Sequence, residues 1–69
     1  MKVKAIYKDG DISIDDNVYN FYLERENNEV WLDWNAEYDK PRETLYLKNI
    51  SLILVDNEIV YMSERDGKQ

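Results

Sequence analysis

Four pairs of turn-forming residues organise this chain. They are Asp9-Gly10, Asp16-Asn17, Asn27-Asn28 and Asp56-Asn57, and all consist of residues that tolerate the positive φ angles of a tight hairpin. Between them, apolar and polar residues alternate with the period of two that is typical of β-strands, and no long stretch has helical periodicity. The sequence therefore predicts an all-β protein of about six to seven short antiparallel strands.

The first half of the chain reads as a series of hairpins. A two-residue turn at Asp9-Gly10 places Tyr7 opposite Ile12 and Ala5 opposite Ile14. Two-residue turns at the next two pairs keep the apolar residues on the same face without a slip in register. We therefore expect residues 2–35 to form a four-stranded meander with one apolar face, on which Trp34 is a core residue.

The second half is expected to add a loop and three more strands. Residues 36–43 read as a loop because Pro41 cannot donate to a strand ladder. Strands are predicted near residues 44–48, 50–55 and 58–63, with the last tight turn at Asp56-Asn57. The phase of the apolar positions shifts across Lys48-Asn49, which predicts a bulge or bend there.

The last hairpin carries apolar residues on both faces. Leu52, Leu54, Ile59 and Tyr61 are expected on one face, and Ile53, Val55, Val60 and Met62 on the other. Such a hairpin needs burial on both sides, by closure of a barrel or by a second subunit. We expect residues 1–63 to form one domain, either a compact SH3-like or partly open barrel or a two-layer sheet, and residues 64–69 to form a frayed tail.

The chain contains neither cysteine nor histidine. The usual metal ligands and the usual general base are therefore missing, and a domain this small has little room for a substrate pocket. Oxygen donors alternate from Asp33 to Asp39, but the glycine and the distant glutamate of a calcium loop are absent. We expect a protein that is not an enzyme and needs no metal or cofactor.

The net charge of −6 is concentrated in residues 24–43, which hold seven acids and three bases. This argues against direct binding to nucleic acid or an anionic membrane, and it suits a basic partner. Carboxylates at alternate positions of a strand are about 6.7 Å apart, close to a single-strand phosphate repeat. The row could therefore imitate a nucleic acid. The alternative is a solvated surface that keeps a small domain soluble.

Trp31 is the candidate anchor of a binding surface. In the expected strand it lies on the face opposite Trp34, across from Glu24 and beside Tyr22. An exposed Trp beside a Tyr is typical of protein interfaces. The alternative is that the last hairpin covers this face and buries both rings. The predicted partner-binding residues are Tyr22, Glu24, Glu26, Glu29, Trp31 and Asp33.

These features favour an acidic protein-binding module. Lys, Asn, Ile and Tyr, which have AT-rich codons, make 25 of the 69 residues, so a low-GC bacterium or its phage is the expected source. The first residues lack the apolar core of a signal peptide, which predicts a cytoplasmic protein. The most specific hypothesis is a phage-encoded inhibitor that imitates nucleic acid and binds a basic host nucleic-acid-processing protein.

Two other functions remain open. A small structural subunit of a larger assembly could self-associate through the C-terminal hairpin. A weak single-strand nucleic-acid binder could stack bases on the nine aromatic side chains, although that mode also needs a positive groove.

Overall fold

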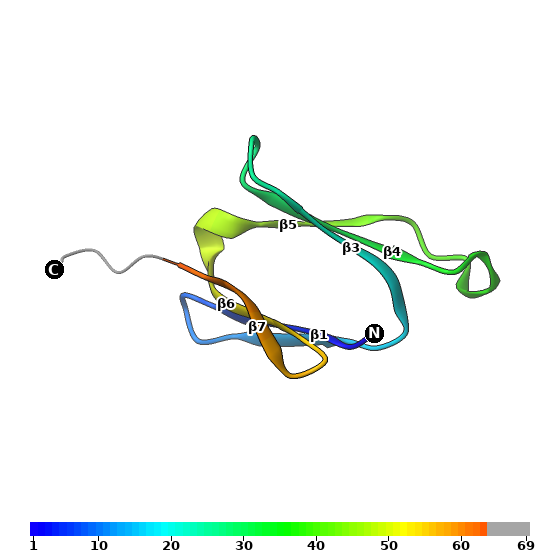
Figure 1. Ribbon diagram of the computed structural model, residues 1–69, viewed down its shortest axis with the longest axis horizontal. Helices are drawn as coiled ribbons and strands as arrows, with labels where there is room; N and C mark the ends of the chain where they lie inside the picture. Colours follow the sequence, from blue (N-terminus) through cyan, green and yellow to red (C-terminus); the bar gives the residue numbers. More distant parts are fainter. Residues whose placement is uncertain (64–69) are drawn as a thin grey trace, which may run out of the picture.

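The computed structural model describes residues 1–63. They form two antiparallel sheets that face each other (Figure 1). One sheet has the order β2-β1-β6-β7 and the other the order β3-β4-β5. The strands are β1 (Val3–Tyr7), β2 (Ile12–Asp15), β3 (Val18–Glu24), β4 (Glu29–Trp34), β5 (Glu43–Tyr46), β6 (Ile50–Val55) and β7 (Glu58–Met62). Two 3-10 helices, η1 (Ala36–Tyr38) and η2 (Leu47–Asn49), lie on either side of β5.

The predicted fold class is confirmed. The described residues form an all-β, two-layer structure of seven short antiparallel strands, and these strands do not close into a barrel. The frayed tail predicted for residues 64–69 lies outside the described residues.

The core lies between the two sheets. Leu32, Ile50 and Ile53 are completely buried there, and aliphatic residues of both sheets surround them. Trp34 is 9% exposed, and its indole N–H donates to the carbonyl oxygen of Asp16 at 3.2 Å. The prediction that Trp34 is a core residue is confirmed. The buried set is Val3, Ala5, Val18, Val30, Leu32, Trp34, Leu45, Leu47, Ile50 and Ile53.

The expected four-stranded meander of residues 2–35 is wrong, because β2 and β3 belong to different sheets. The chain crosses between the sheets at Asp16 and Asn17, and β1 pairs with β6 instead. The first residue of β3 bonds to the N-terminus: the Val18 N–H donates to the Met1 carbonyl at 2.9 Å, and the Met1 ammonium donates to the Val18 carbonyl at 2.7 Å. Splitting the strands between two layers lets each apolar face cover the other.

The register predicted for the first hairpin is wrong by one residue. The loop contains Lys8 as well as Asp9 and Gly10, and Ile6 rather than Tyr7 lies opposite Ile12. The Lys8 N–H donates to the Asn49 carbonyl at 2.8 Å, so Lys8 is bonded to η2 and does not pair with Asp11. A one-residue shift exchanges the two faces of a strand. Ile12 and Ile14 are therefore on the outside of the molecule, 57% and 54% exposed.

The register predicted for the β3–β4 hairpin is wrong by two residues, which leaves the faces unchanged. The connection is residues 25–28, and Leu23 lies opposite Val30. Trp31 consequently lies directly opposite Tyr22 and not opposite Glu24. A bulge at Tyr19 separates this regular part of the ladder from the Val18–Trp34 pair.

The second half of the chain follows the prediction more closely. Asp56 and Asn57 have φ angles of 50° and 71°, as a two-residue hairpin turn requires. Residues 35–42 connect β4 to β5, so the loop predicted for residues 36–43 ends before Glu43, the first residue of β5. The bend predicted at Lys48-Asn49 is η2, which carries the chain from one sheet to the other.

The faces of the last hairpin differ from the prediction at its end. A bulge in the β6–β7 ladder leaves Val60 as an extra residue, since Tyr61 pairs with Ile53 and Ile59 with Leu54. The bulge places Tyr61 against the core and Met62 on the outer face. Within residues 1–63 the hairpin is covered on its inner side, and Ile59, Val60 and Met62 are exposed.

Candidate protein-interaction surfaces

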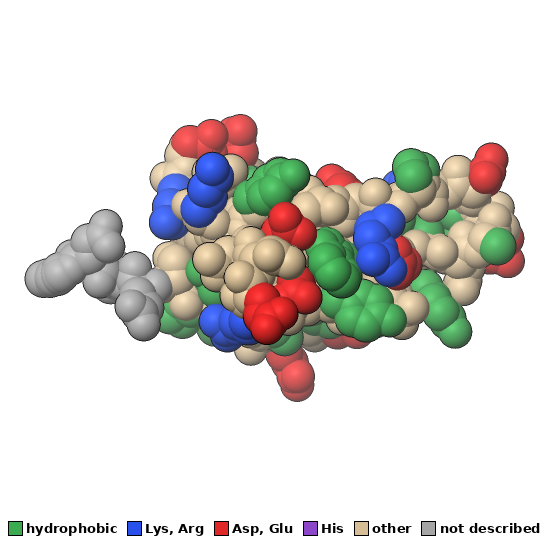
Figure 2. All heavy atoms as spheres, turned by 90° about the horizontal axis from the view of Figure 1, so that it is seen from above, with side chains coloured by type: hydrophobic (Ala, Val, Ile, Leu, Met, Phe, Trp, Pro, Cys, Tyr) green, Lys and Arg blue, Asp and Glu red, His purple; other side chains and the backbone are tan. Residues whose placement is uncertain are grey.

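The outer side of the three-stranded sheet carries five of the six predicted partner-binding residues. Tyr22 and Glu24 of β3 lie opposite Trp31 and Glu29 of β4, and Asp33 lies opposite Asn20. Glu26 is in the adjoining turn and is exposed. We call Tyr22, Glu24, Glu26, Glu29, Trp31 and Asp33 the aromatic-acidic face. Figure 2 views this side of the molecule and shows apolar and acidic side chains interleaved over it.

Tyr22 and Trp31 form the centre of the aromatic-acidic face. Their ring centroids are 6.4 Å apart and their planes are inclined by 61°, an edge-to-face contact. Tyr22 is 46% exposed and Trp31 is half-buried. The last hairpin belongs to the other sheet, so the alternative in which it covers this face is wrong.

Arg42, which the sequence reasoning missed, lies over the two rings. Its guanidinium carbon is 5.0 Å from the centre of the Trp31 ring and 5.8 Å from that of Tyr22. Its Nε and Nη2 atoms donate to the two carboxylate oxygens of Asp33 at 2.8 and 3.0 Å. These bonds lower the pKa of Asp33 and raise that of Arg42. Asp33 is therefore neutralised within the chain, unlike the glutamates predicted with it.

The three glutamates gather at the turn end of the β3–β4 hairpin. Glu24 and Glu29 are direct neighbours across the ladder, an arrangement that brings like charges together. The Glu24 carboxylate accepts the backbone N–H of Glu26 at 2.9 Å, and that of Glu29 accepts the indole N–H of Trp31 at 2.9 Å. Within residues 1–63 neither forms an ion pair. Glu24, Glu26 and Glu29 therefore form a concentrated negative patch, which we call the glutamate cluster.

Glu43 is a second carboxylate with a shifted pKa, and it lies at the edge between the two sheets. Partial burial raises the pKa of Glu43 above its ordinary value, the negative charge of Asp15 raises it further, and Lys40 partly offsets both effects. Asp15 belongs to β2 and Glu43 to β5, so this repulsion acts between the two layers.

The outer side of the four-stranded sheet is apolar. Ile12, Ile14, Ile59 and Met62 are each more than half exposed on it. They surround the less exposed Ile6, Leu52 and Leu54, which completes what we call the aliphatic face. Lys4 lies within the same face, opposite Ile14 and Leu54. The sequence indicated only the part from the last hairpin, because the mistaken register assigned Ile12 and Ile14 to the core.

Two further structural findings concern metals and membranes. Among residues 1–63, no three acidic side chains come together in a way that could hold a metal ion. The same residues contain no helix with the length and apolar character required to cross a bilayer.

No family model matches this chain, and comparisons with curated proteins and with solved structures found no match.

Proposed function

We propose that this protein is an acidic, non-enzymatic protein-binding module that docks on a basic partner through its aromatic-acidic face. The supporting observation is the contact between Tyr22 and Trp31 on the outer face, beside the glutamate cluster. Buried aromatic anchors supply most of the binding energy in many interfaces, and surrounding charges supply selectivity and a faster on-rate.

The Arg42–Asp33 pair supports this role because it holds the aromatic rings in place. Its two hydrogen bonds fix the guanidinium over Trp31 and Tyr22, and Glu29 fixes the indole from the other side. Side chains that are already ordered lose less conformational entropy on binding. The face therefore combines a preorganised aromatic centre with a negative patch at one end.

The partner we propose is a basic, nucleic-acid-processing protein of a bacterial host, and the module is a phage-encoded inhibitor that acts in the cytoplasm. Three properties support this form of the proposal: the net charge of −6, the excess of acids in residues 24–43, and the AT-rich amino-acid usage. A negative surface of this kind competes with DNA or RNA for a basic groove.

The test is a quantitative pull-down from a low-GC bacterial lysate with the tagged full chain. We expect a DNA- or RNA-binding protein to be captured, and to be released by added duplex DNA and by Trp31→Ala. The triple reversal of Glu24, Glu26 and Glu29 to Lys should abolish capture. A matched control reverses Asp11, Glu37 and Glu58, which carry the same charge outside the face. An equal loss of capture in both triple variants would show that capture depends only on net charge, which would contradict the proposal.

Self-association through the aliphatic face is the second candidate function. The observation that favours it is the exposure of Ile12, Ile14, Ile59 and Met62 on one sheet face. Contiguous exposed apolar surface of this kind marks association sites in many proteins. Sedimentation velocity should then show a defined oligomer that Met62→Lys dissociates, whereas the exposed Tyr38→Lys has no effect. A monomer at millimolar concentration would exclude this candidate.

A further inference from the structure

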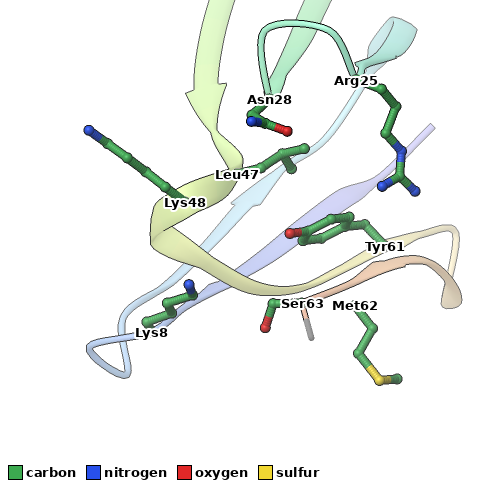
Figure 3. A pocket seen from close by; sticks show the side chains of 8 residues that line it. All are labelled: Lys8, Arg25, Asn28, Leu47, Lys48, Tyr61, Met62 and Ser63. Atoms are coloured by element: carbon green, nitrogen blue, oxygen red, sulfur yellow. The ribbon is translucent and has the colours of Figure 1, made fainter. Parts of the chain in front are cut away.

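A cleft of about 530 Å³ lies beside the end of β7 (Figure 3). Its lining comes from three connections and from β7 of the four-stranded sheet. Arg25 and Asn28 come from the β3–β4 turn, Lys8 from the β1–β2 turn, and Lys48 from η2. Tyr61 of β7 lies in the middle. We call this feature the end cleft.

The charge of the end cleft is opposite to that of the protein. Three of the seven Lys and Arg residues in the described part of the chain line it, and no acidic residue of that part does. None of the three forms an ion pair within residues 1–63. Carboxylates follow or flank them in sequence at Asp9, Glu24 and Glu26, but these are not part of the lining. Cations around one opening attract anions to it.

Backbone hydrogen bonds hold the cationic segments together. The Lys8 N–H donates to the Asn49 carbonyl at 2.8 Å, which joins the first turn to η2. The Leu47 N–H donates to the Asn28 carbonyl at 2.9 Å, which joins η2 to the β3–β4 turn. Residues far apart in sequence are thereby fixed around one opening. Figure 3 shows the Lys48 side chain extending away from Arg25 and Tyr61, so this flexible side chain must turn inward to reach a ligand beside Arg25.

The lining has the donors that phosphate groups require. The Arg25 guanidinium carbon is 5.6 Å from the centre of the Tyr61 ring, within the range of a cation–π contact. Arginine of this kind binds phosphate with two parallel hydrogen bonds, and lysine adds point charge. Asn28, Tyr61 and Ser63 contribute neutral polar groups. Leu47 supplies an apolar side.

We propose that the end cleft binds a small molecule that carries two or more phosphate groups and is of about nucleotide size. Three cations suit a ligand with several negative charges, and the volume lies within the range of small-molecule sites. The phosphate oxygens accept hydrogen bonds from Arg25, Lys8 and Lys48, while the less polar part of the ligand rests on Tyr61. The proposal does not rest on the proposed protein-binding function, although Arg25 and Asn28 share the β3–β4 turn region with the glutamate cluster.

The experiment is an NMR titration of the full ¹⁵N-labelled chain with three probes at equal salt: sodium tripolyphosphate, ATP and a short single-stranded oligothymidylate. We expect saturable shifts for the first two probes at the amides of Lys8, Asn28 and Ser63. ATP should bind more tightly than tripolyphosphate because its base adds contacts with Tyr61. Tighter binding of the oligonucleotide at the same amides would assign the cleft to nucleic acid and overturn the proposal of a small molecule.

Variants decide whether the cleft itself binds. Arg25→Gln and Lys48→Gln should each weaken ATP binding about tenfold, as the loss of one charge-assisted hydrogen bond implies. Arg25→Lys keeps the charge and should fall between Arg25→Gln and the unchanged protein. The matched control is Lys2→Gln, which removes the same charge near the Asp56 turn. Equal weakening by Lys2→Gln, or shifts that do not saturate, would show only nonspecific attraction and overturn the proposal.

Discussion

Arg42 and Asp33 are joined by two parallel hydrogen bonds of 2.8 and 3.0 Å, and the same guanidinium lies 5.0 Å from the centre of the Trp31 ring. One side chain thus neutralises an acid of the aromatic-acidic face and covers its aromatic centre. A binding partner must either contact Arg42 in this position or displace its side chain from the aromatic rings. Substitutions of Arg42 therefore distinguish the effect of charge on this face from the effect of its shape.

Replacing Arg42 with Gln should return the pKa of Asp33 toward its ordinary value, since the hydrogen bonds from Arg42 are the main cause of its lowering. A lowered carboxylate pKa stabilises the fold above the unfolded-state pKa, and this stabilisation is lost as the pH falls through the folded-state pKa. Arg42→Gln should therefore be less stable than the parent protein at neutral pH. The two proteins should be equally stable in strong acid, where Asp33 is protonated in both. Carboxyl ¹³C NMR titration of Asp33 measures the shift, and an unchanged titration would refute the assignment.

Glu43 should show the opposite dependence on pH. Its pKa is raised by burial and by Asp15, so the fold favours the protonated acid. That contribution is fully present below the unfolded-state pKa and is lost as the pH rises through the folded-state pKa. Glu43→Gln should therefore be more stable than the parent protein at pH 7, with a gain that disappears near pH 4. Urea denaturation at several pH values measures it. Glu58→Gln, on the opposite edge of the four-stranded sheet from Asp15, is the control and should show no such gain.

Gly10 should be sensitive to substitution for its backbone conformation alone. Its φ is +98°, and a Cβ added there would meet nothing within 4 Å. Gly10→Ala should therefore cost about 1 kcal/mol of the free energy of unfolding, because alanine resists positive φ. Asparagine tolerates this region better, so Gly10→Asn should cost less. Equal stability of all three proteins in urea would mean that the loop adopts another conformation.

Two isoleucine substitutions distinguish the observed register from the predicted one. Ile53 is completely buried, whereas Ile14 is 54% exposed. Ile53→Val should therefore cost about 1 kcal/mol in the free energy of unfolding, and Ile14→Val should cost almost nothing in the monomer. The register predicted from sequence made Ile14 a core residue and implies comparable costs. Denaturation at low protein concentration measures both, and equal costs would favour the predicted register.

The sequence was informative where structure depends on neighbouring residues. The turn at Asp56-Asn57 is such a case, because two residues that tolerate positive φ lie between two apolar strands. The inner position of Trp34 and the outer position of Trp31 also follow from strand alternation. A register error of two residues does not change these positions.

Features that depend on distant parts of the chain were not predictable in this way. Asp9-Gly10 suits loops of two or three residues, and the hydrogen bond from Lys8 to Asn49, which accompanies the longer loop, joins residues far apart in sequence. The pairing of β1 with β6 leaves no local pattern, so the separation of β2 from β3 was missed. For the candidate site, Tyr22 and Trp31 were expected together, but nothing in the sequence singled out Arg42 as the partner of Asp33.

The bulge at Val60 also has a consequence for how copies of this chain can meet. β7 is an edge strand, and edge strands with unbroken ladders can recruit further strands into fibrils. Here the extra residue interrupts the ladder beside the exposed Ile59, and bulges of this kind twist an edge away from a new strand. Under the proposed self-association through the aliphatic face, copies would meet face to face, where two identical faces related by a twofold axis satisfy each other and growth stops.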